Sequence, residues 1–427
     1  AMTSGGGISS LSLSDDGNSL TFLRNGTLNV LNLRANNFPT VAVTFRADWL
    51  RDVAEERKAA YQQFWRIYNR TFYDSNFHGR DWVAIRERYR KQLDGVGHRN
   101  EMATVINMLT GELEASHAEV SPAPGNPSGS NTAHLGFTID YSFAGPGIKI
   151  KEVPRRTPGS YAKTKLSAGE IVTAINGQKV VANEQLWRVV ADQTGRELKL
   201  DVTGADGKSR TVTYRGLSSG EYSGILYRNR IDDRRKYVEE KSGGKLTYVH
   251  IAGMGGGNLE TFNLQAWQYL QGKQGAIIDV RNNGGGNIAD LLLDMLERKP
   301  NMRYQLRDGD AILGPGTSWD RPTVVMHAET SFSNAEMFPA SMKAAGLATL
   351  VGMPTPGYVI YTSGGRLVDG TSIRLPGTGV YRLDGTPTEN LGQEPDIKVD
   401  ITPEEYFAGK DPQLDKAIET LMRMTGR

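Results

Sequence analysis

The stretch VVMHAETSFSNAEMF (residues 324–338) joins a short apolar run, a turn with two serines and the start of a helix. The apolar run at 324–326 is typical of a buried strand, and the residues after Asn334 have helical spacing. Ser331 and Ser333 lie in the turn. A serine at a helix start is an ordinary N-cap, but backbone N–H groups and the positive end of the helix dipole also stabilise an oxyanion there. The stretch therefore predicts either a plain helix cap or a nucleophile at a strand–turn–helix junction.

Strands and helices alternate around this stretch. Three further apolar runs are expected to be strands: KLTYVHIAG (245–253), GAIIDVR (275–281) and ATLVGMPT (348–355). Three segments have helical spacing: NLETFNLQAWQYL (258–270), IADLLLDMLERKP (288–300) and PQLDKAIETLMRM (412–424). This alternation predicts an α/β domain, a sheet covered by helices, over residues 221–427.

Three regions of different composition precede that domain. Residues 1–47 alternate apolar and polar residues around the tight turns DDGN and RNGT, which predicts a short antiparallel β meander. Residues 48–130 place Tyr61, Phe64, Trp65 and Tyr68 at helical spacing, which predicts a helical domain with an aromatic core. Residues 131–220, after a loop rich in Pro, Gly and Ser, predict a small β domain with one helix.

The composition excludes several classes of function. The chain has 50 Lys and Arg against 48 Asp and Glu, which argues against nucleic acid as the main partner. No apolar run approaches the ~20 residues of a membrane span. Without cysteine there is no disulfide, thiolate metal site or cysteine nucleophile, and the six histidines lack metal-ligand spacing. The N-terminal AMTSGGGISS does not have the pattern of a signal peptide.

A glycine-rich loop follows one of the expected strands. In DVRNNGGGN (279–287), three consecutive glycines allow a backbone N–H to approach a ligand closely, or simply turn the chain. The loop lacks the Walker lysine and the GxGxxG spacing, so a nucleotide is not indicated. No cofactor and no metal are expected.

Three histidines and one glutamate are candidates for acid–base chemistry. His117, in ASHAEVS, could act as a general base oriented by Ser116. His327 competes with it, because it lies at the end of the strand before Ser333, whereas His250 lies inside a strand and is expected to be structural. Glu389 could anchor a base or could be an ordinary loop charge.

Together these motifs resemble the tricorn-type branch of the S41 serine peptidases, and the resemblance covers nearly the whole chain. It is carried by YQQFWRIYNRTFYDSNFHGRDW, ASHAEV, LSAGEIVTAINGQKV, IIDVRNNGGG, SFSNAE and TENLGQEPDI. It implies a multidomain α/β protein: the end of an upstream β-propeller (1–47), a helical domain carrying the base (48–130), a PDZ-like domain (131–220) and a crotonase-like catalytic domain (221–427).

The resemblance also implies a role for each matching residue. Ser333, three residues before Glu336, falls on the nucleophile. Ser331 is then no longer a candidate nucleophile, and His327 is no longer a candidate base. The remaining matches are His117 as base, Ser116 as its hydroxyl partner, Glu389 as the carboxylate behind that hydroxyl, Gly286 and Asn334 as oxyanion-hole N–H donors, and Gly285 beside the substrate.

Two further residues bear on substrate binding. The archaeal tricorn enzyme favours basic residues at the cleaved position through an Asp, and Gln305 stands at the matching place here, which predicts a preference for neutral residues. Asp308 and Asp310 lie nearby in case the alignment is shifted. In the PDZ-like domain, GPGIKIKEV (145–153) with Ile148 could supply a sheet edge that binds a peptide, and the equal alternative is that this domain is only a spacer between the base and the nucleophile.

The expected function is therefore that of a serine peptidase that hydrolyses peptides or unfolded polypeptides through an acyl-enzyme. The alternatives are a non-catalytic PDZ-type peptide-binding scaffold and, less favoured, an acyl-CoA enzyme, because the crotonase fold is shared. The resemblance allows a homo-oligomer and implies a cytoplasmic location, while an extracytoplasmic one stays open because a signal could precede this sequence.

Overall fold

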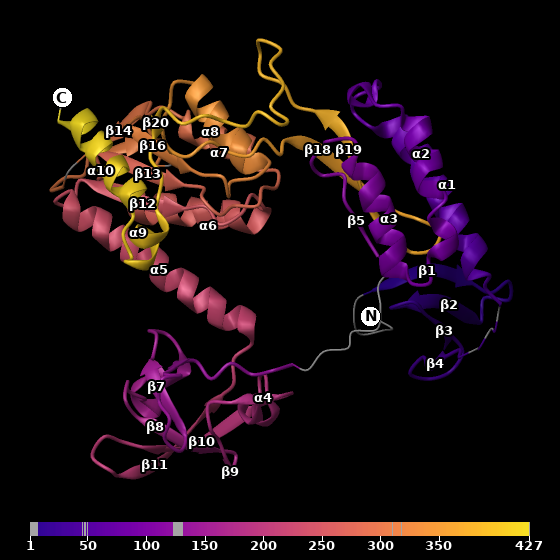
Figure 1. Ribbon diagram of the computed structural model, residues 1–427, viewed down its shortest axis with the longest axis horizontal. Coiled ribbons are helices and arrows are strands. Elements are labelled where there is room, and N and C mark those ends of the chain that lie inside the picture. The colour runs from indigo at the N-terminus through magenta and orange to yellow at the C-terminus, as the bar shows by residue number, and fades with distance from the viewer. Residues whose placement is uncertain are drawn as a thin grey trace. The chain divides into compact units, whose positions relative to one another are not determined.

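The computed structural model describes residues 7–44, 46, 48, 50–122, 131–309, 311–316 and 318–426. Asp310 lies outside the described residues. The chain forms two compact units, Ala1–Lys58 and Ala59–Arg427. The elements are labelled in Figure 1.

The first unit contains a four-stranded antiparallel meander in the order β1-β2-β3-β4. Its strands are β1 (Ile8–Leu13), β2 (Ser19–Arg24), β3 (Thr27–Asn32) and β4 (Thr40–Ala42). Asn25 and Gly26 both have positive φ, as the two-residue turn between β2 and β3 requires. The meander expected from the sequence is confirmed, whereas its origin as part of a propeller stays a prediction.

Three helices pack around an aromatic core: α1 (Val53–Thr71), most of which belongs to the second unit, α2 (Trp82–Arg90) and α3 (Arg99–Gly111). Tyr61, Phe64 and Tyr68 are fully buried, as their helical spacing predicts. Asp81 caps α2 by accepting the Ala84 N–H at 2.9 Å, which fixes where the helix begins.

A hairpin from the C-terminal part of the chain completes this helical region. The strands β18 (Ile360–Arg366) and β19 (Ser372–Gly379) form a three-stranded sheet with β5 (Val120–Ser121). Ile373 packs in the same core as the helices, and the Tyr68 hydroxyl donates to Arg374 O at 2.6 Å. This hairpin lies within the range 221–427 but packs on the helices, and the predicted domain bounds stay a prediction.

Another sheet, with six strands, has the order β11-β10-β8-β7-β6, with β9 beside β8. Its elements are β6 (Thr138–Ile139), β7 (Ile148–Glu152), β8 (Ile171–Ile175), β9 (Gln178–Lys179), β10 (Glu197–Thr203), β11 (Ser209–Arg215) and the helix α4 (Glu184–Val190). Because β7 lies between β8 and β6, and Ile148 is 0 % exposed, the expectation that Ile148 marks a peptide-binding edge is wrong. The order ends at β6 on one side and at β11 on the other.

The α/β region is built on a parallel five-stranded sheet in the order β12-β13-β16-β17-β20. The strands are β12 (Leu246–His250), β13 (Gly275–Asp279), β16 (Thr323–His327), β17 (Thr349–Gly352) and β20 (Ile397–Lys398). Every residue of β12, β13 and β16 is buried, as expected for a sheet with helices on both faces. The predicted α/β fold class is confirmed.

Helices cover both faces of this sheet (Figure 1). One face packs on α5 (Ser219–Lys241) and α10 (Pro412–Thr425), and the other on α6 (Gly256–Gln265), α7 (Ala289–Leu296) and α8 (Asn334–Ala344). This region also contains a π-helical turn (Ala266–Leu270), α9 (Pro403–Phe407) and the small hairpin β14 (Met302–Tyr304) and β15 (Ile312–Gly314). The loops at the carboxyl ends of β13 and β16 carry the glycines and serines singled out from the sequence.

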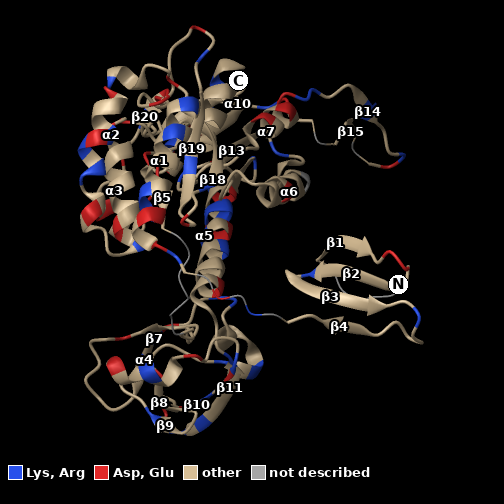
Figure 2. Ribbon diagram, turned by 90° about the vertical axis from the view of Figure 1, so that its right-hand side faces the viewer, with Lys and Arg blue, Asp and Glu red and all other residues tan. Residues whose placement is uncertain are grey.

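Charges of both signs are interspersed on the surface. Figure 2 shows Lys and Arg residues beside Asp and Glu residues along α5. Among the described residues, no helix is long and apolar enough to cross a membrane. Within that same part of the chain, no group of three or more acidic or histidine side chains could hold a metal ion.

Candidate active site

Ser333 lies between β16 and α8 in a backbone conformation that serine rarely adopts. Its φ is 58° and its ψ is −120°, and its N–H donates to Glu336 Oε1 at 3.0 Å. Such strain persists only where the surroundings enforce it, and it clusters at functional sites. The side chain is partly exposed at the start of α8. Ser333 therefore has the exposure and the strained turn that a nucleophile at a helix start requires.

Ser331 is occupied in holding the same turn together. It is 0 % exposed, its hydroxyl donates to Val280 O at 2.9 Å, and it accepts the Ala328 N–H at 3.2 Å. A buried hydroxyl with both bonds made has no access to a substrate. Of the two serines in the quoted stretch, only Ser333 remains a candidate nucleophile.

The glycine loop packs directly on the Ser333 turn. Gly285 has φ 90°, and a Cβ there would lie 2.7 Å from both Ser333 Cβ and Phe332 O. Gly286 has φ 150°, and a Cβ there would lie 2.1 Å from Met254 O. The Phe332 N–H donates to Asn283 O at 2.9 Å, which holds the loop and the turn together. Both glycines are required by close approach, so the loop is more than a simple chain reversal.

Two backbone N–H groups beside Ser333 remain available to an anion. In the part of the chain that the structure describes, neither the Gly286 nor the Asn334 N–H donates to a protein acceptor. Asn334 is the first residue of α8, where backbone N–H groups have no partner within the helix. The Asn334 side chain is turned away to accept the Ala289 N–H at 2.8 Å. These two amides can stabilise negative charge on a substrate oxygen.

A hydrogen-bonded relay joins His117, Ser116 and Glu389. Ser116 Oγ donates to Glu389 Oε2 at 3.0 Å and lies 2.7 Å from His117 Nδ1. Because a hydroxyl has one hydrogen, which Glu389 accepts, His117 Nδ1 must be the protonated nitrogen that donates to Ser116. His117 Nε2 then carries a lone pair and can accept a proton.

The Glu389 carboxylate is itself held firmly. It is 6 % exposed and also accepts the Ser116 N–H at 2.6 Å and the Val359 N–H at 2.8 Å. A carboxylate that accepts three hydrogen bonds from fixed donors keeps a single orientation. Glu389 is therefore not an ordinary loop charge but the fixed end of the relay.

The electrostatic surroundings favour the neutral form of His117. Burial and, to a smaller extent, the nearby Arg374 guanidinium lower the pKa of His117 to about 4, although Glu119 acts in the opposite direction. Arg374 Nη1 donates to Glu119 Oε1 at 2.6 Å, which reduces the influence of both charges on the imidazole. His117 is thus unprotonated at neutral pH, as a general base must be.

The pairing of His117 with Ser333 stays a prediction. Among the described residues, no hydrogen bond joins the His117 imidazole to the Ser333 hydroxyl. The competing His327 is 0 % exposed, and its burial lowers the pKa to about 4. His250 is held by Tyr227 and by Arg281 O, in keeping with a structural role.

The Gln305 side chain makes its hydrogen bonds within its own hairpin and not with the relay or the glycine loop. It is exposed in the loop after β14, where its side chain donates to Leu306 O at 3.1 Å and to Gly309 O at 3.0 Å. Neither of these hydrogen bonds involves Ser333. Ile148 lies in the core of the six-stranded sheet, which is not the sheet that carries Ser333. The specificity expected from Gln305 stays a prediction.

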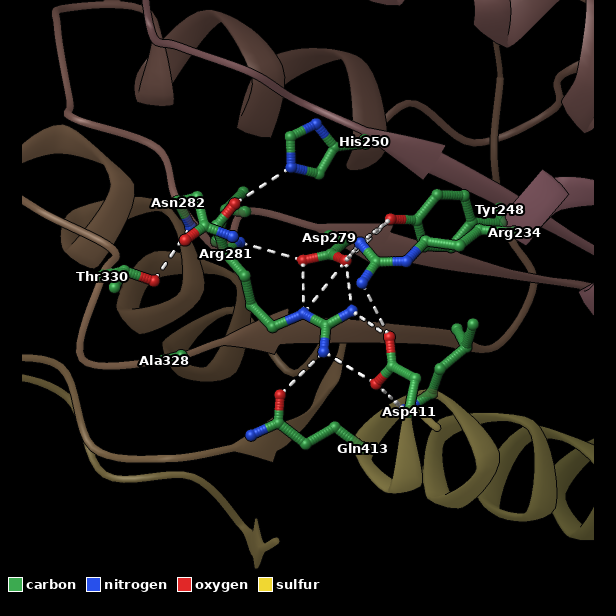
Figure 3. A network of polar contacts seen from close by, with 12 residues as sticks. Arg234, Tyr248, His250, Asp279, Arg281, Asn282, Ala328, Thr330, Asp411 and Gln413 are labelled. Atoms are coloured by element: carbon green, nitrogen blue, oxygen red, sulfur yellow. Dashed lines mark hydrogen bonds and ion pairs between the residues drawn. The ribbon is translucent and has the colours of Figure 1, made fainter. Parts of the chain in front are cut away.

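A buried ion network, not foreseen from the sequence, supports the start of the glycine loop (Figure 3). Asp279 at the end of β13 accepts from Tyr248 at 2.7 Å and from Arg281 Nη2 at 2.7 Å. Arg281 Nη1 donates to Asp411 at 2.9 Å and to Gln413 at 2.8 Å, which ties the loop to α10. The charged pair in DVR, directly after a buried strand, is the signal that could have indicated it.

The Asp279 carboxylate and the Arg281 guanidinium in this network are both charged. Burial alone would raise the pKa of Asp279, but the Arg281 guanidinium beside it, with His250 and Arg234, holds that pKa well below its usual range. Arg234 of α5 pairs with Asp411 at 2.9 Å, so α5, α10 and β13 meet at these charges. The loop that presents Gly286 is thereby fixed by elements far apart in the sequence.

Two family models match the chain. The model of peptidase family S41 matches residues 245–399, which contain the glycine loop, Ser333 and Glu389. The model of the tricorn protease C1 domain matches residues 53–111, which form the helices α1 to α3.

Related proteins and one solved structure agree with the models. Tricorn protease homolog 1 of Streptomyces coelicolor is 30 % identical over 86 % of this chain and 35 % of its own length. The tricorn protease of Thermoplasma acidophilum is 28 % identical over 87 % of this chain and 35 % of its own. The chain thus spans about a third of these two relatives. The crystal structure of the tricorn protease matches 99 % of this chain and 42 % of its own, with a TM-score of 0.87 and 24 % identity, which shows that the fold is shared.

Proposed function

Because this chain belongs to the tricorn-type branch of peptidase family S41, we propose that it hydrolyses peptides or unfolded polypeptides through an acyl-enzyme on Ser333. The observation that carries the proposal is the Glu389–Ser116–His117 relay, which joins residues 273 positions apart and leaves a basic nitrogen on His117. A purely structural loop would not need a buried carboxylate to orient an imidazole.

In the first step His117 Nε2 removes the Ser333 hydroxyl proton as Oγ attacks the peptide carbonyl carbon. The positive charge that forms on the imidazole is stabilised by the hydrogen bond to Ser116 and, through it, by the Glu389 carboxylate. The carbonyl oxygen becomes an oxyanion held by the Gly286 and Asn334 N–H groups. Each such donor typically contributes ~3 kcal/mol to the transition state.

In the second step the tetrahedral adduct collapses. His117 gives its proton to the leaving amine, the C–N bond breaks, and an ester to Ser333 remains. Water then attacks this ester with His117 again as base, which releases the carboxylic acid and restores the serine. No cofactor or metal takes part in the proposed mechanism.

The test compares Ser333→Ala with Ser331→Ala in hydrolysis of a fluorogenic peptide. Ser333→Ala is expected to abolish hydrolysis and to stay folded, because the backbone bonds that begin α8, from the Glu336 N–H to Ser333 O at 2.8 Å and from the Ser333 N–H to Glu336 Oε1 at 3.0 Å, do not need the hydroxyl. Ser331→Ala is expected to keep hydrolysis and to lose some stability, because two buried hydrogen bonds disappear. Hydrolysis by Ser333→Ala at the wild-type rate would disprove the proposal.

A peptide-binding role for the six-stranded sheet is a second proposal, favoured by one groove. This groove, of about 80 Å³, lies beside the edge strand β6. Its lining includes Phe137, just before β6, and Leu186 and Trp187 of α4. A peptide could add to the β6 edge with an apolar side chain in the groove. Trp187 is 52 % exposed, so Trp187→Ala tests recruitment without disturbing the core. Slower hydrolysis of long peptides alone would support recruitment, and unchanged hydrolysis of all lengths would reject it.

A further inference from the structure

Residues 355–359, here called the strap, are held by two buried carboxylates from different parts of the site. Glu336, in the first turn of α8, is 2 % exposed and accepts the Gly357 N–H at 2.7 Å, the Tyr358 N–H at 2.8 Å and the Thr355 hydroxyl at 2.6 Å. Glu389 accepts the N–H of the next residue, Val359, at 2.8 Å. Successive residues of one short segment therefore bind the helix of the nucleophile and the relay of the base.

The strap has little freedom to move. The Asn390 N–H donates to Gly357 O at 2.7 Å, so the strap is also bonded to the residue after Glu389. Gly357 has φ 82°, and a Cβ there would lie 2.6 Å from Leu391 N. The Tyr358 ring stacks on Phe332, the neighbour of Ser333, with centroids 5.6 Å apart. A rigid segment of this kind transmits the position of one end to the other.

Glu336 also binds the nucleophile directly. Its Oε1 accepts both the Ser333 N–H at 3.0 Å and the Tyr358 N–H, so one oxygen joins the strained serine to the strap. Its burial raises the pKa of Glu336, and the four hydrogen bonds oppose that rise. Burial of a carboxylate costs free energy, and an exposed residue could cap the helix equally well. The burial of Glu336 therefore indicates a role beyond capping.

Resting on the proposed function, we propose that Glu336 is a positioning residue that sets the place of His117 relative to Ser333 through the strap and Glu389. The route is continuous in hydrogen bonds and backbone: Ser333 to Glu336, Glu336 to Tyr358, Val359 to Glu389, and Glu389 through Ser116 to His117. It links two halves of the site that no direct hydrogen bond joins among the described residues.

The test is a double-mutant cycle with Glu336→Gln and Glu389→Gln. The measured quantity is the rate at which a fluorophosphonate labels Ser333. Glu336→Gln removes one of two acceptor oxygens and is expected to slow labelling about tenfold or more. Since both carboxylates act on one route, the double variant is expected to be no more than about twofold slower than the slower single variant. Effects that multiply would show that Glu336 acts on Ser333 alone and would overturn the proposal.

The matched control is Glu405→Gln, which removes a carboxylate from the same capping-box position of α9. It is expected to label at the wild-type rate. Equal labelling rates for Glu336→Gln and Glu405→Gln would also overturn the proposal. If Glu336→Gln fails to fold, Thr355→Val removes a single hydroxyl donor to Glu336 and should slow labelling, and Thr355→Ser should restore it.

An activity-independent measurement separates this proposal from the proposed function. The ¹⁵N signals of the His117 ring report its tautomer and hydrogen bonding. Glu336→Gln is expected to shift them toward their values in Glu389→Gln, whereas Glu405→Gln should leave them unchanged. A wild-type protein that is never labelled at Ser333 would contradict the proposed peptidase. Unchanged His117 signals in Glu336→Gln would contradict the positioning role whatever the activity.

Discussion

Ser116→Ala removes the hydroxyl that stands between the base and its carboxylate. Two hydrogen bonds are lost: the one from His117 Nδ1 to Ser116 Oγ at 2.7 Å, and the one from Ser116 Oγ to Glu389 Oε2 at 3.0 Å. Glu389 keeps the N–H groups of Ser116 and Val359, so the carboxylate should stay in place. The damage is therefore expected at His117 and not in the fold.

The size of the effect follows from the charge on the imidazole. A hydrogen bond to a charged group contributes about 1.5–3 kcal/mol, and this one is charged only while His117 holds the serine proton. A loss confined to the transition state lowers kcat by roughly tenfold to 150-fold. KM should change by less than about twofold, because Ser116 contacts the relay and is not proposed to bind substrate.

The assay measures kcat and KM of a fluorogenic peptide for wild type, Ser116→Ala and Ser116→Thr. Threonine keeps a hydroxyl and should restore most of kcat, which an effect of side-chain volume would not do. A thermal melt reports whether each variant is folded. Wild-type kcat in Ser116→Ala would refute the relay, and so would a rise in KM with kcat unchanged.

Three further outcomes are expected. Burial is the main reason that the pKa of His117 is lowered to about 4, so protonation removes the base only near that pH. The acidic limb of the kcat/KM profile should therefore have its midpoint near 4 and not near the ordinary 6.5. A midpoint near 6.5 would contradict a buried His117 as the base. Gly286→Ala should lower kcat roughly 100-fold through loss of one oxyanion donor, because the added Cβ would lie 2.1 Å from Met254 O and must displace the backbone. The control Gly284→Ala should keep its activity, because its Cβ would meet no atom within 4 Å. Equal activities of the two variants would contradict the role of Gly286. Arg281→Met removes the main ion-pair partner of the fully buried Asp279, which keeps the Tyr248 hydroxyl and the more distant Arg234, and should lower the free energy of unfolding by about 3–5 kcal/mol. Urea denaturation measures this loss, and an unchanged midpoint would show that the network in Figure 3 does not hold the loop.

Local patterns were sufficient for most of the individual elements. The spacing of Tyr61, Phe64 and Tyr68 predicted a helix with those rings inside, and all three are buried. The apolar run before Ser333 predicted a buried strand, and every residue of β16 is buried. Such signals depend on periodicity, which is a property of neighbouring residues.

Contacts between distant segments could not be predicted in this way. Nothing near residue 373 indicates that Ile373 packs among helices nearly three hundred residues earlier. The same holds for Glu336, whose place in the motif was recognised but whose hydrogen bonds to residues 355–358 depend on tertiary structure. Alternation alone also could not tell that Ile148 lies in an interior strand and not at an edge. These are features of sheet order and side-chain burial.

The identity of the nucleophile is tested most directly by mass-spectrometric mapping of a fluorophosphonate adduct on the intact protein. One modified peptide is expected, with the phosphonate on Ser333, and the reaction should be much slower in His117→Ala because the base is absent. An adduct on Ser331 or on another residue would contradict it. So would peptide hydrolysis that continues undiminished while Ser333 is fully modified.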